Sequence, residues 1–183
     1  MNKQLLTLIC LLLGLATLTA QGYIKFDGID GEATEPMHKG WSDLTYFSVD
    51  MSNATSAASV GGGRATGKVN FGDLIISKNL DKSSPKLMEA LATGKNIPKV
   101  ELHVINKMRE GKSATYYRYE LKNVTITSYQ ISGDAYDTST PPNEQISMSY
   151  ASISVFYVEM DQNGKPKGEI PFKWDIKGNK AGN

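Results

Sequence analysis

Three groups of residues have types and spacings that could bind phosphate or metal, or act in catalysis. Residues 62–68 nearly match the glycine-rich sequence that wraps a nucleotide phosphate, G-x-x-x-x-G-K-[ST]. Val69 replaces the hydroxyl that would hold magnesium, and the residues after it alternate like a strand, so no helix N-terminus would face the phosphate. We expect a flexible glycine loop here and no nucleotide cofactor.

The second group is a cluster of carboxylates at Asp27, Asp30 and Glu32. It lacks the ligand spacing and the closing glutamate of a calcium-binding loop, and the glycines between the acids are typical of tight turns. We interpret this segment as a turn.

The third group is the two histidines, His38 and His103. His103 shares a predicted strand face with Glu101, which indicates a surface or interface pair, and His38 has Glu35 as its sequence-near partner. Two histidines without cysteine ligands argue against a zinc centre, and the chain has no G-x-S-x-G nucleophile elbow. We therefore expect no metal, no cofactor and no catalytic residue.

The single cysteine, Cys10, lies in an N-terminal segment typical of a secretory signal peptide. A basic start at Lys3 precedes a mostly apolar run over residues 5–18, which is short for a transmembrane helix. We expect cleavage after Ala20, although Leu18 stands where a small residue is preferred, and an uncleaved anchor is the alternative. The predicted organisation is a signal peptide at residues 1–20 and one cysteine-free domain at residues 21–183, secreted or periplasmic and not membrane-bound in its mature form.

The composition fits an ordinary globular domain. The chain has 183 residues, 40% of them hydrophobic, and a formal net charge of +1. A domain of this length can bury a core without disulfides, whereas a nucleic-acid-binding protein usually carries a basic surplus for phosphate contacts. We therefore expect no nucleic-acid partner.

Alternating apolar and polar residues predict a mainly β fold of seven or eight strands. The expected strands include residues 23–27, 44–49, 68–76, 98–108, 116–131, 146–160 and 169–176. A change of apolar phase near Ala151 indicates a bulge or corner of the kind that curved or closed sheets require. Most of the tyrosines in these strands are expected in the core or in cross-strand pairs, and the others at subunit interfaces.

One helix is predicted, with a cap at Ser83 and Ser84, Pro85 at its first turn, and a stop at Gly94. The resulting fold class is a small β-barrel or two-sheet sandwich with one flanking α-helix. Residues 52–67 contain little to bury and are predicted to form a long loop, which in a compact domain is usually functional or disordered.

In chain order, several segments resemble the Hcp family, the tube proteins of type VI secretion systems. They are residues 23–34, 38–44 and 47–48, the Asp-Lys-Ser-Ser-Pro-Lys-Leu segment at 81–87, and residues 99–102, 116–121, 124–129, 142–147 and 174–179. The resemblance implies a small β-barrel of two sheets, homohexameric rings with a central pore, and stacking of the rings into a tube. It implies as partners further copies of this chain and the sheath, spike and effector proteins of the apparatus.

The resemblance also implies that the long loop reaches a neighbouring ring. The expected ring-stacking residues are Ser52, Asn53, Ala54, Thr55, Ser56, Val60, Gly61, Gly62, Gly63, Arg64 and Gly67. The signal-like segment departs from the family, whose tubes are assembled in the cytoplasm and fired outward. Two interpretations stay open: a tube component with an unusual N-terminus, and a separately exported ring-forming binding module that works without a sheath. A secreted β-sandwich enzyme is a third.

Overall fold

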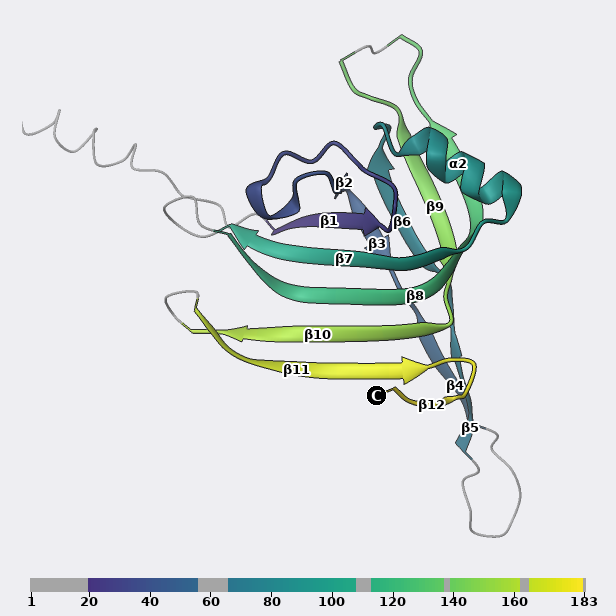
Figure 1. The fold of residues 1–183 in the computed structure, drawn as a ribbon, viewed down its shortest axis with the longest axis vertical. Coiled ribbons are helices and arrows are strands. Elements are labelled where there is room, and N and C mark those ends of the chain that lie inside the picture. Colours follow the sequence, from purple (N-terminus) through teal and green to yellow (C-terminus); the bar gives the residue numbers. More distant parts are fainter. Residues whose placement is uncertain (1–19, 56–65, 108–112, 137–138, 162–164, 183) are drawn as a thin grey trace, which may run out of the picture.

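The computed structural model describes residues 20–55, 66–107, 113–136, 139–161 and 165–182. They form the strands β1 to β12, the helix α2 and the short 3-10 helix η1 (Pro36–His38), as Figure 1 shows. The predicted class, mainly β with one flanking α-helix, is confirmed. The strands are more numerous than expected because three predicted runs, 44–49, 68–76 and 146–160, are each divided in two, and because the predicted loop contributes β4.

The large sheet has the antiparallel order β12-β11-β10-β8-β7-β1-β2. Its strands are β1 (Ala20–Phe26), β2 (Ser42–Leu44), β7 (Ile97–Lys107), β8 (Ser113–Ser132), β10 (Ser152–Met160), β11 (Pro166–Asp175) and β12 (Lys180–Ala181). Among the described residues, the two edge strands β2 and β12 are short and do not pair with each other. The large sheet is therefore open and does not form a closed barrel.

The small sheet crosses one end of the large sheet and covers part of its inner face (Figure 1). It has the order β3-β6-β9-β8, with β3 (Tyr46–Ser48), β6 (Leu74–Asn79) and β9 (Asn143–Ser149). The long strand β8 belongs to both sheets, since its first half pairs with β7 and β10 and its second half with β9.

The corner predicted near Ala151 is confirmed. The chain leaves the small sheet at the end of β9 and enters the large sheet at β10, and the Ala151 amide donates to the Lys122 carbonyl at 3.0 Å. On β8, the residue next to Lys122 is Asn123, which has a left-handed φ of 52°. Both strands of this hairpin therefore change direction at one point, which allows a single hairpin to serve two sheets.

The core lies between the two sheets and α2 (Ser84–Thr93). Leu74 and Ile146 of the small sheet pack against inward residues of the large sheet, and Leu87 and Ala90 attach the helix. The helix ends as predicted, because Gly94 adopts a left-handed φ of 64° and its amide closes the last turn.

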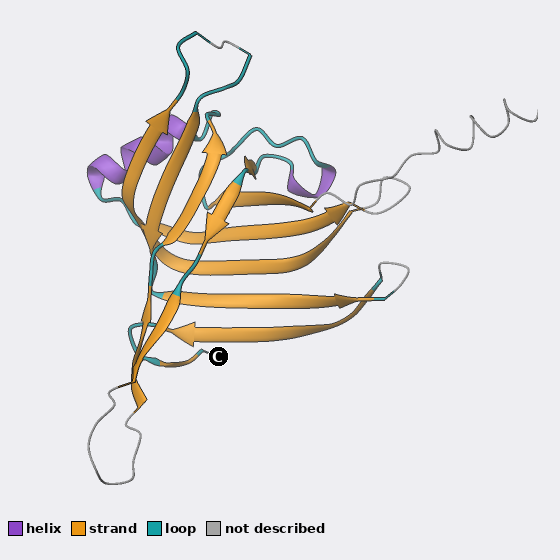
Figure 2. Cartoon of the chain, turned by 180° about the vertical axis from the view of Figure 1, so that it is seen from behind, coloured by secondary structure: helices purple, strands orange, loops and turns teal. Residues whose placement is uncertain are grey.

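The predicted long loop is wrong at its two ends. Residues 51–55 and 66–71 form the strands β4 (Met51–Thr55) and β5 (Thr66–Phe71), a separate two-stranded sheet that we call the arm. The exposed side chains at the root of the arm produced no burial pattern that a strand prediction could use. The arm projects past β11 and β12, away from the loop that follows β8 (Figures 1 and 2).

The candidate assembly surface and the contacts that support it

The inner face of the large sheet carries continuous rows of apolar side chains. In one row the register places Ile24, Leu102, Tyr119, Val155 and Phe172 side by side across five strands. Exposure rises along this row, from 0% at Ile24 and 1% at Leu102 to 40% at Phe172. The chemistry of the face stays apolar although its burial decreases from β1 to β11.

The next row shows the same gradient more strongly. Val104, Tyr117, Tyr157 and Ile170 are neighbours across β7, β8, β10 and β11. Val104 is 7% exposed, whereas Tyr157 is 45% and Ile170 is 64% exposed. We call the group Tyr117, Tyr157, Ile170 and Phe172 the uncovered face. An exposed, contiguous apolar patch of this kind is typical of an interaction surface.

The outer face of the same strands has a different character. Glu101 lies 2.6 Å from Lys99, and Arg118 bonds to Glu169 at 3.2 Å. The Arg118 guanidinium also stacks over the ring of Phe156, 4.2 Å from its centroid. These charged pairs make the outer face suited to contact with water. The uncovered face therefore belongs to the inner side of the sheet alone.

Strand β11 is incomplete in a second way. Residues 166–172 are all exposed, and β12 pairs with β11 only at Trp174 and Asp175. The remaining backbone groups along that edge have no strand partner among the described residues. A long exposed edge of this kind invites pairing or covering by another chain.

A cleft of about 250 Å³ separates the arm from the end of β11. Its walls are mostly apolar and comprise Met51, Ser52, Asn53, Val69, Phe71, Phe172 and Trp174. The Trp174 ring is parallel to the Phe172 ring, with their centroids 6.4 Å apart, and lies the same distance from Phe71. The cleft extends the uncovered face onto the arm.

The root of the arm is held by hydrogen bonds. The Gly72 amide donates to the Asp50 carbonyl at 3.0 Å, and the Tyr150 hydroxyl donates to the Gly72 carbonyl at 3.1 Å. Burial raises the pKa of Tyr150 to about 12, so its hydroxyl keeps its proton at physiological pH. The arm is therefore attached to the core at a defined point.

The predicted ring-stacking residues lie on the arm where the structure describes them. Residues 52–55 belong to β4, with Ser52 and Asn53 exposed, and Gly67 belongs to β5. The remaining predicted residues, Ser56, Val60, Gly61, Gly62, Gly63 and Arg64, lie outside the described residues. Lys68 and Val69 are in β5, so a strand and not a helix follows the glycine-rich segment, as predicted.

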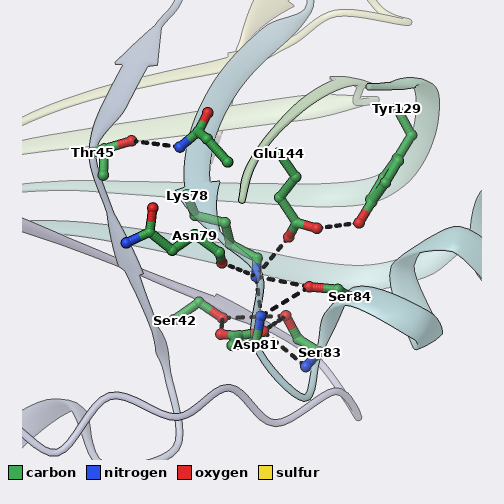
Figure 3. A network of polar contacts seen from close by, with 10 residues as sticks. Ser42, Thr45, Lys78, Asn79, Asp81, Ser83, Ser84, Tyr129 and Glu144 are labelled. Carbon is green, nitrogen blue, oxygen red and sulfur yellow. Dashed lines mark hydrogen bonds and ion pairs between the residues drawn. The ribbon is translucent and has the colours of Figure 1, made fainter. Parts of the chain in front are cut away.

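On the buried face of the small sheet, Lys78 and Glu144 form an ion pair that the sequence analysis missed (Figure 3). Their Nζ and Oε1 atoms are 2.6 Å apart, and both side chains are fully buried. The Tyr129 hydroxyl donates to the other oxygen of Glu144. Lys78 also donates to Asp81 at 2.8 Å and to the Asn79 carbonyl at 3.1 Å, so neither charge is left without a polar contact.

The same network explains the segment at residues 81–87. Asp81 accepts from the Ser83 amide at 2.8 Å and from the Ser42 hydroxyl at 2.6 Å. Burial opposes ionisation of Asp81, but bonds from Lys78, Ser42 and Ser83 outweigh it and lower its pKa. Ser83 occupies the N-cap position as expected, but its side chain makes no capping hydrogen bond. The start of the helix is ordered instead by Asp81, which accepts from the Ser83 amide. Through these bonds, Asp81 joins the start of the helix to β2 and β6.

The prediction that His103 pairs with Glu101 at a surface is wrong. Nδ1 of His103 lies 2.9 Å from Nε2 of His38, while Glu101 pairs with Lys99. The two histidines are brought together by η1, which folds back over β1 and β7. The acidic turn is as predicted, because the Ile29 amide donates to the Phe26 carbonyl at 3.0 Å. Across the described residues, no three metal-ligating side chains cluster.

The described helices include none that is long and apolar enough to span a membrane. The signal peptide predicted at residues 1–20 lies outside the described residues except for Ala20, the first residue of β1. Pairing of β1 with β7 continues through Gln21 and Gly22 to Phe26. The predicted cleavage point lies directly after Ala20, the first described residue of β1.

Comparison with known proteins gives matches over most of the chain. A family model described as "Type VI secretion system effector, Hcp" matches residues 23–157. Protein Hcp1 of Pseudomonas aeruginosa is 31% identical over 113 residues, which are 61% of this chain and 68% of that protein.

The solved structures agree with this match. One described as the structure of a type six secretion system protein superposes with a TM-score of 0.81 at 34% identity, over 88% of this chain and 99% of the other. Hcp1 from Salmonella typhimurium has a TM-score of 0.71 at 24% identity, over 90% and 99% of the two chains.

Proposed function

Since this chain belongs to the Hcp family of type VI secretion proteins, we propose that it is a structural subunit that assembles with copies of itself into a hexameric ring of the secretion tube. The uncovered face of β10 and β11 carries this proposal. It is apolar, it continues the core of the subunit, and it borders a strand edge without a partner.

The position of this surface suits a ring. In a ring, a neighbouring copy would cover the uncovered face with a different part of its own surface. Such heterologous contacts close into a ring when the rotation between subunits closes. Covering Tyr157, Ile170 and Phe172 would remove three large apolar side chains from water, each worth about 1–2 kcal/mol at their present exposure.

The arm is proposed to contact the next ring. It projects beyond the two main sheets and is anchored at Gly72 and Tyr150, so it can reach outward without disturbing the core. The sheath, spike and effector proteins of a secretion system are the further partners that this role would involve. The proposal assigns the chain no catalytic step.

A second candidate function follows from the N-terminal segment. Residues 1–20 have the composition of a signal peptide, and removal up to Ala20 would leave the β1–β7 pairing from Gln21 onward. A chain exported in this way would act as a ring-forming binding module in the periplasm or medium. The mass of the protein recovered from each cell fraction distinguishes the two: a product beginning at Gln21 outside the cytoplasm supports the module, and an intact N-terminus in the cytoplasm supports the tube.

The assembly surface is tested by native mass spectrometry of matched variants. Ile170→Glu and Phe172→Glu place a charge on the uncovered face and are expected to convert hexamers into monomers. Met88→Glu on α2 is the control, since Met88 is 46% exposed but lies away from this face. Loss of hexamers in the control as well, or their persistence in both face variants, would contradict the proposed surface.

A further inference from the structure

His38 and His103 face each other beside β1 and β7 of the large sheet. Nε2 of His38, which is 1% exposed, lies 2.9 Å from Nδ1 of the half-buried His103. On the other side of the His38 ring, Nδ1 lies 2.6 Å from a carboxylate oxygen of Glu35. Because an ionised carboxylate only accepts, Nδ1 of His38 carries a proton. The contact between Nε2 of His38 and Nδ1 of His103 therefore has room for one proton, carried by either nitrogen.

The rings are confined on several sides. Tyr23 of β1 stacks on His38 with centroids 4.4 Å apart, and Trp41 contacts both histidines. The Ser113 hydroxyl, at the start of β8, donates to the second oxygen of Glu35 at 2.9 Å. Nε2 of His103 is buried and has no hydrogen-bond partner among the described residues.

The charges facing this cluster favour a neutral His103. Burial is the largest cause that lowers its pKa to about 4, followed by the charge of His38 and, more weakly, of Arg118 on β8; Glu101 on β7 acts in the opposite direction. Burial also opposes ionisation of Glu35, but hydrogen bonds from His38, Ser113 and the Met37 amide hold its pKa below the usual value. From β1, Tyr23 is uncharged because burial raises its pKa to about 12.

The cluster secures the segment of residues 33–41 to the sheet. Within the segment, the Ala33 amide donates to the Trp41 carbonyl at 2.7 Å, and the Gly40 amide donates to the Ala33 carbonyl at 3.2 Å. Toward the sheet, Ala33 and Trp41 pack against Tyr23 and Ile105 in a small second core. The Lys25 ammonium also donates to the Gly40 carbonyl at 3.2 Å, and the bonds of His38 to Glu35 and His103 add to these contacts in attaching the segment to the sheet.

We propose that Glu35, His38 and His103 form an acid-released latch, which holds residues 33–41 on β1 and β7 at neutral pH and releases them when a second proton enters the contact between the two rings. With a proton on each facing nitrogen, two N–H donors and two positive charges oppose each other without an acceptor. Tyr23, stacked on His38, and Trp41, which contacts both histidines, restrict a small adjustment, so relief requires the segment to leave the sheet. The latch acts within one subunit and does not depend on ring assembly.

Amide hydrogen exchange of the full chain, followed by NMR, tests the latch. From about pH 7 to about pH 3.5, we expect the protection factors of the Ala33, Gly40 and Trp41 amides to fall at least tenfold, while those of Leu102 in β7 are retained. In His103→Gln, which cannot acquire the second positive charge, the same amides should keep their protection at the lower pH.

The imidazole resonances of the wild-type chain give an independent measurement if the variant does not fold. The loss of protection should follow the protonation of His103. Protonation without loss of protection, simultaneous loss at Leu102, or an equal loss in His103→Gln would each overturn the latch.

Discussion

Lys78 and Glu144 are directly opposite each other on β6 and β9, and their charged atoms are 2.6 Å apart in a region closed to solvent. Removing an ion from water is costly, so such a pair is stable only when both members keep their partners. Here Tyr129, Asp81 and the Asn79 carbonyl complete the polar contacts. The pair thus joins the small sheet to the start of α2.

Breaking this pair should strongly destabilise the subunit. Lys78→Met leaves the buried Glu144 carboxylate without its cation, and we expect a loss of about 3–5 kcal/mol in the free energy of unfolding. Urea denaturation measures it. Lys86→Met removes an exposed pair with Glu89 and should leave the midpoint unchanged. Equal effects of the two substitutions would show that the buried network adds nothing specific.

The close approach at Gly31 gives a second prediction. A Cβ atom on Gly31 would lie 2.3 Å from the Trp41 carbonyl oxygen, a backbone atom that cannot rotate away. Gly31→Ala should therefore cost about 1–3 kcal/mol by overpacking, measured as a lower midpoint of thermal unfolding. Gly168→Ala in β11 is the matched control, because no atom lies within 4 Å of its Cβ position. A Gly31→Ala midpoint equal to that of the control would refute the tight packing.

The lowered pKa of His103 predicts a pH dependence of stability. Between pH 6.5 and about 4, the unfolded chain binds a proton at this histidine that the folded chain does not, because burial opposes its charge. The free energy of unfolding should thus fall as the pH decreases through this window, by about 1–2 kcal/mol for a half-buried ring. Urea unfolding of the wild type and of His103→Gln checks this, since the variant should lose less stability; parallel pH profiles would disprove it.

Deletion of residues 54–63 tests the role of the arm. The anchoring bonds at Gly72, Asp50 and Tyr150 lie outside the deletion, so the main sheets should stay folded, with a shift of the thermal midpoint of only a few degrees. Stacking of rings, followed by electron microscopy, should be lost while single rings remain. Unfolding of the deleted chain would show instead that the segment belongs to the core.

Local patterns were sufficient to predict much of the fold. Strict alternation at Val100, Leu102 and Val104 identified β7, since one of its faces is buried and the other is polar. Pro85 and Gly94 located α2 because their backbone preferences act within one turn. The predicted strand at 68–76 included most of β5, but β4 was missed because its described side chains are exposed, and a strand without a buried face has no apolar period.

The buried contacts depend on pairing between distant strands, which no local pattern shows. A signal was nevertheless present: Lys78 is in phase with the buried Leu74 and Ile76, and Glu144 with Ile146 and Met148. Opposite charges at inward positions of two strands indicate a buried pair. For His38 and His103 there was no such signal, because an irregular segment brings one to the other.

The most direct measurement of the central claim is a cryo-electron microscopy reconstruction of the purified wild-type chain. We expect a six-fold ring in which a neighbouring copy covers Tyr157, Ile170 and Phe172 and lies against the edge of β11. A particle that remains a monomer at high concentration, or a ring in which these side chains face solvent, would contradict it.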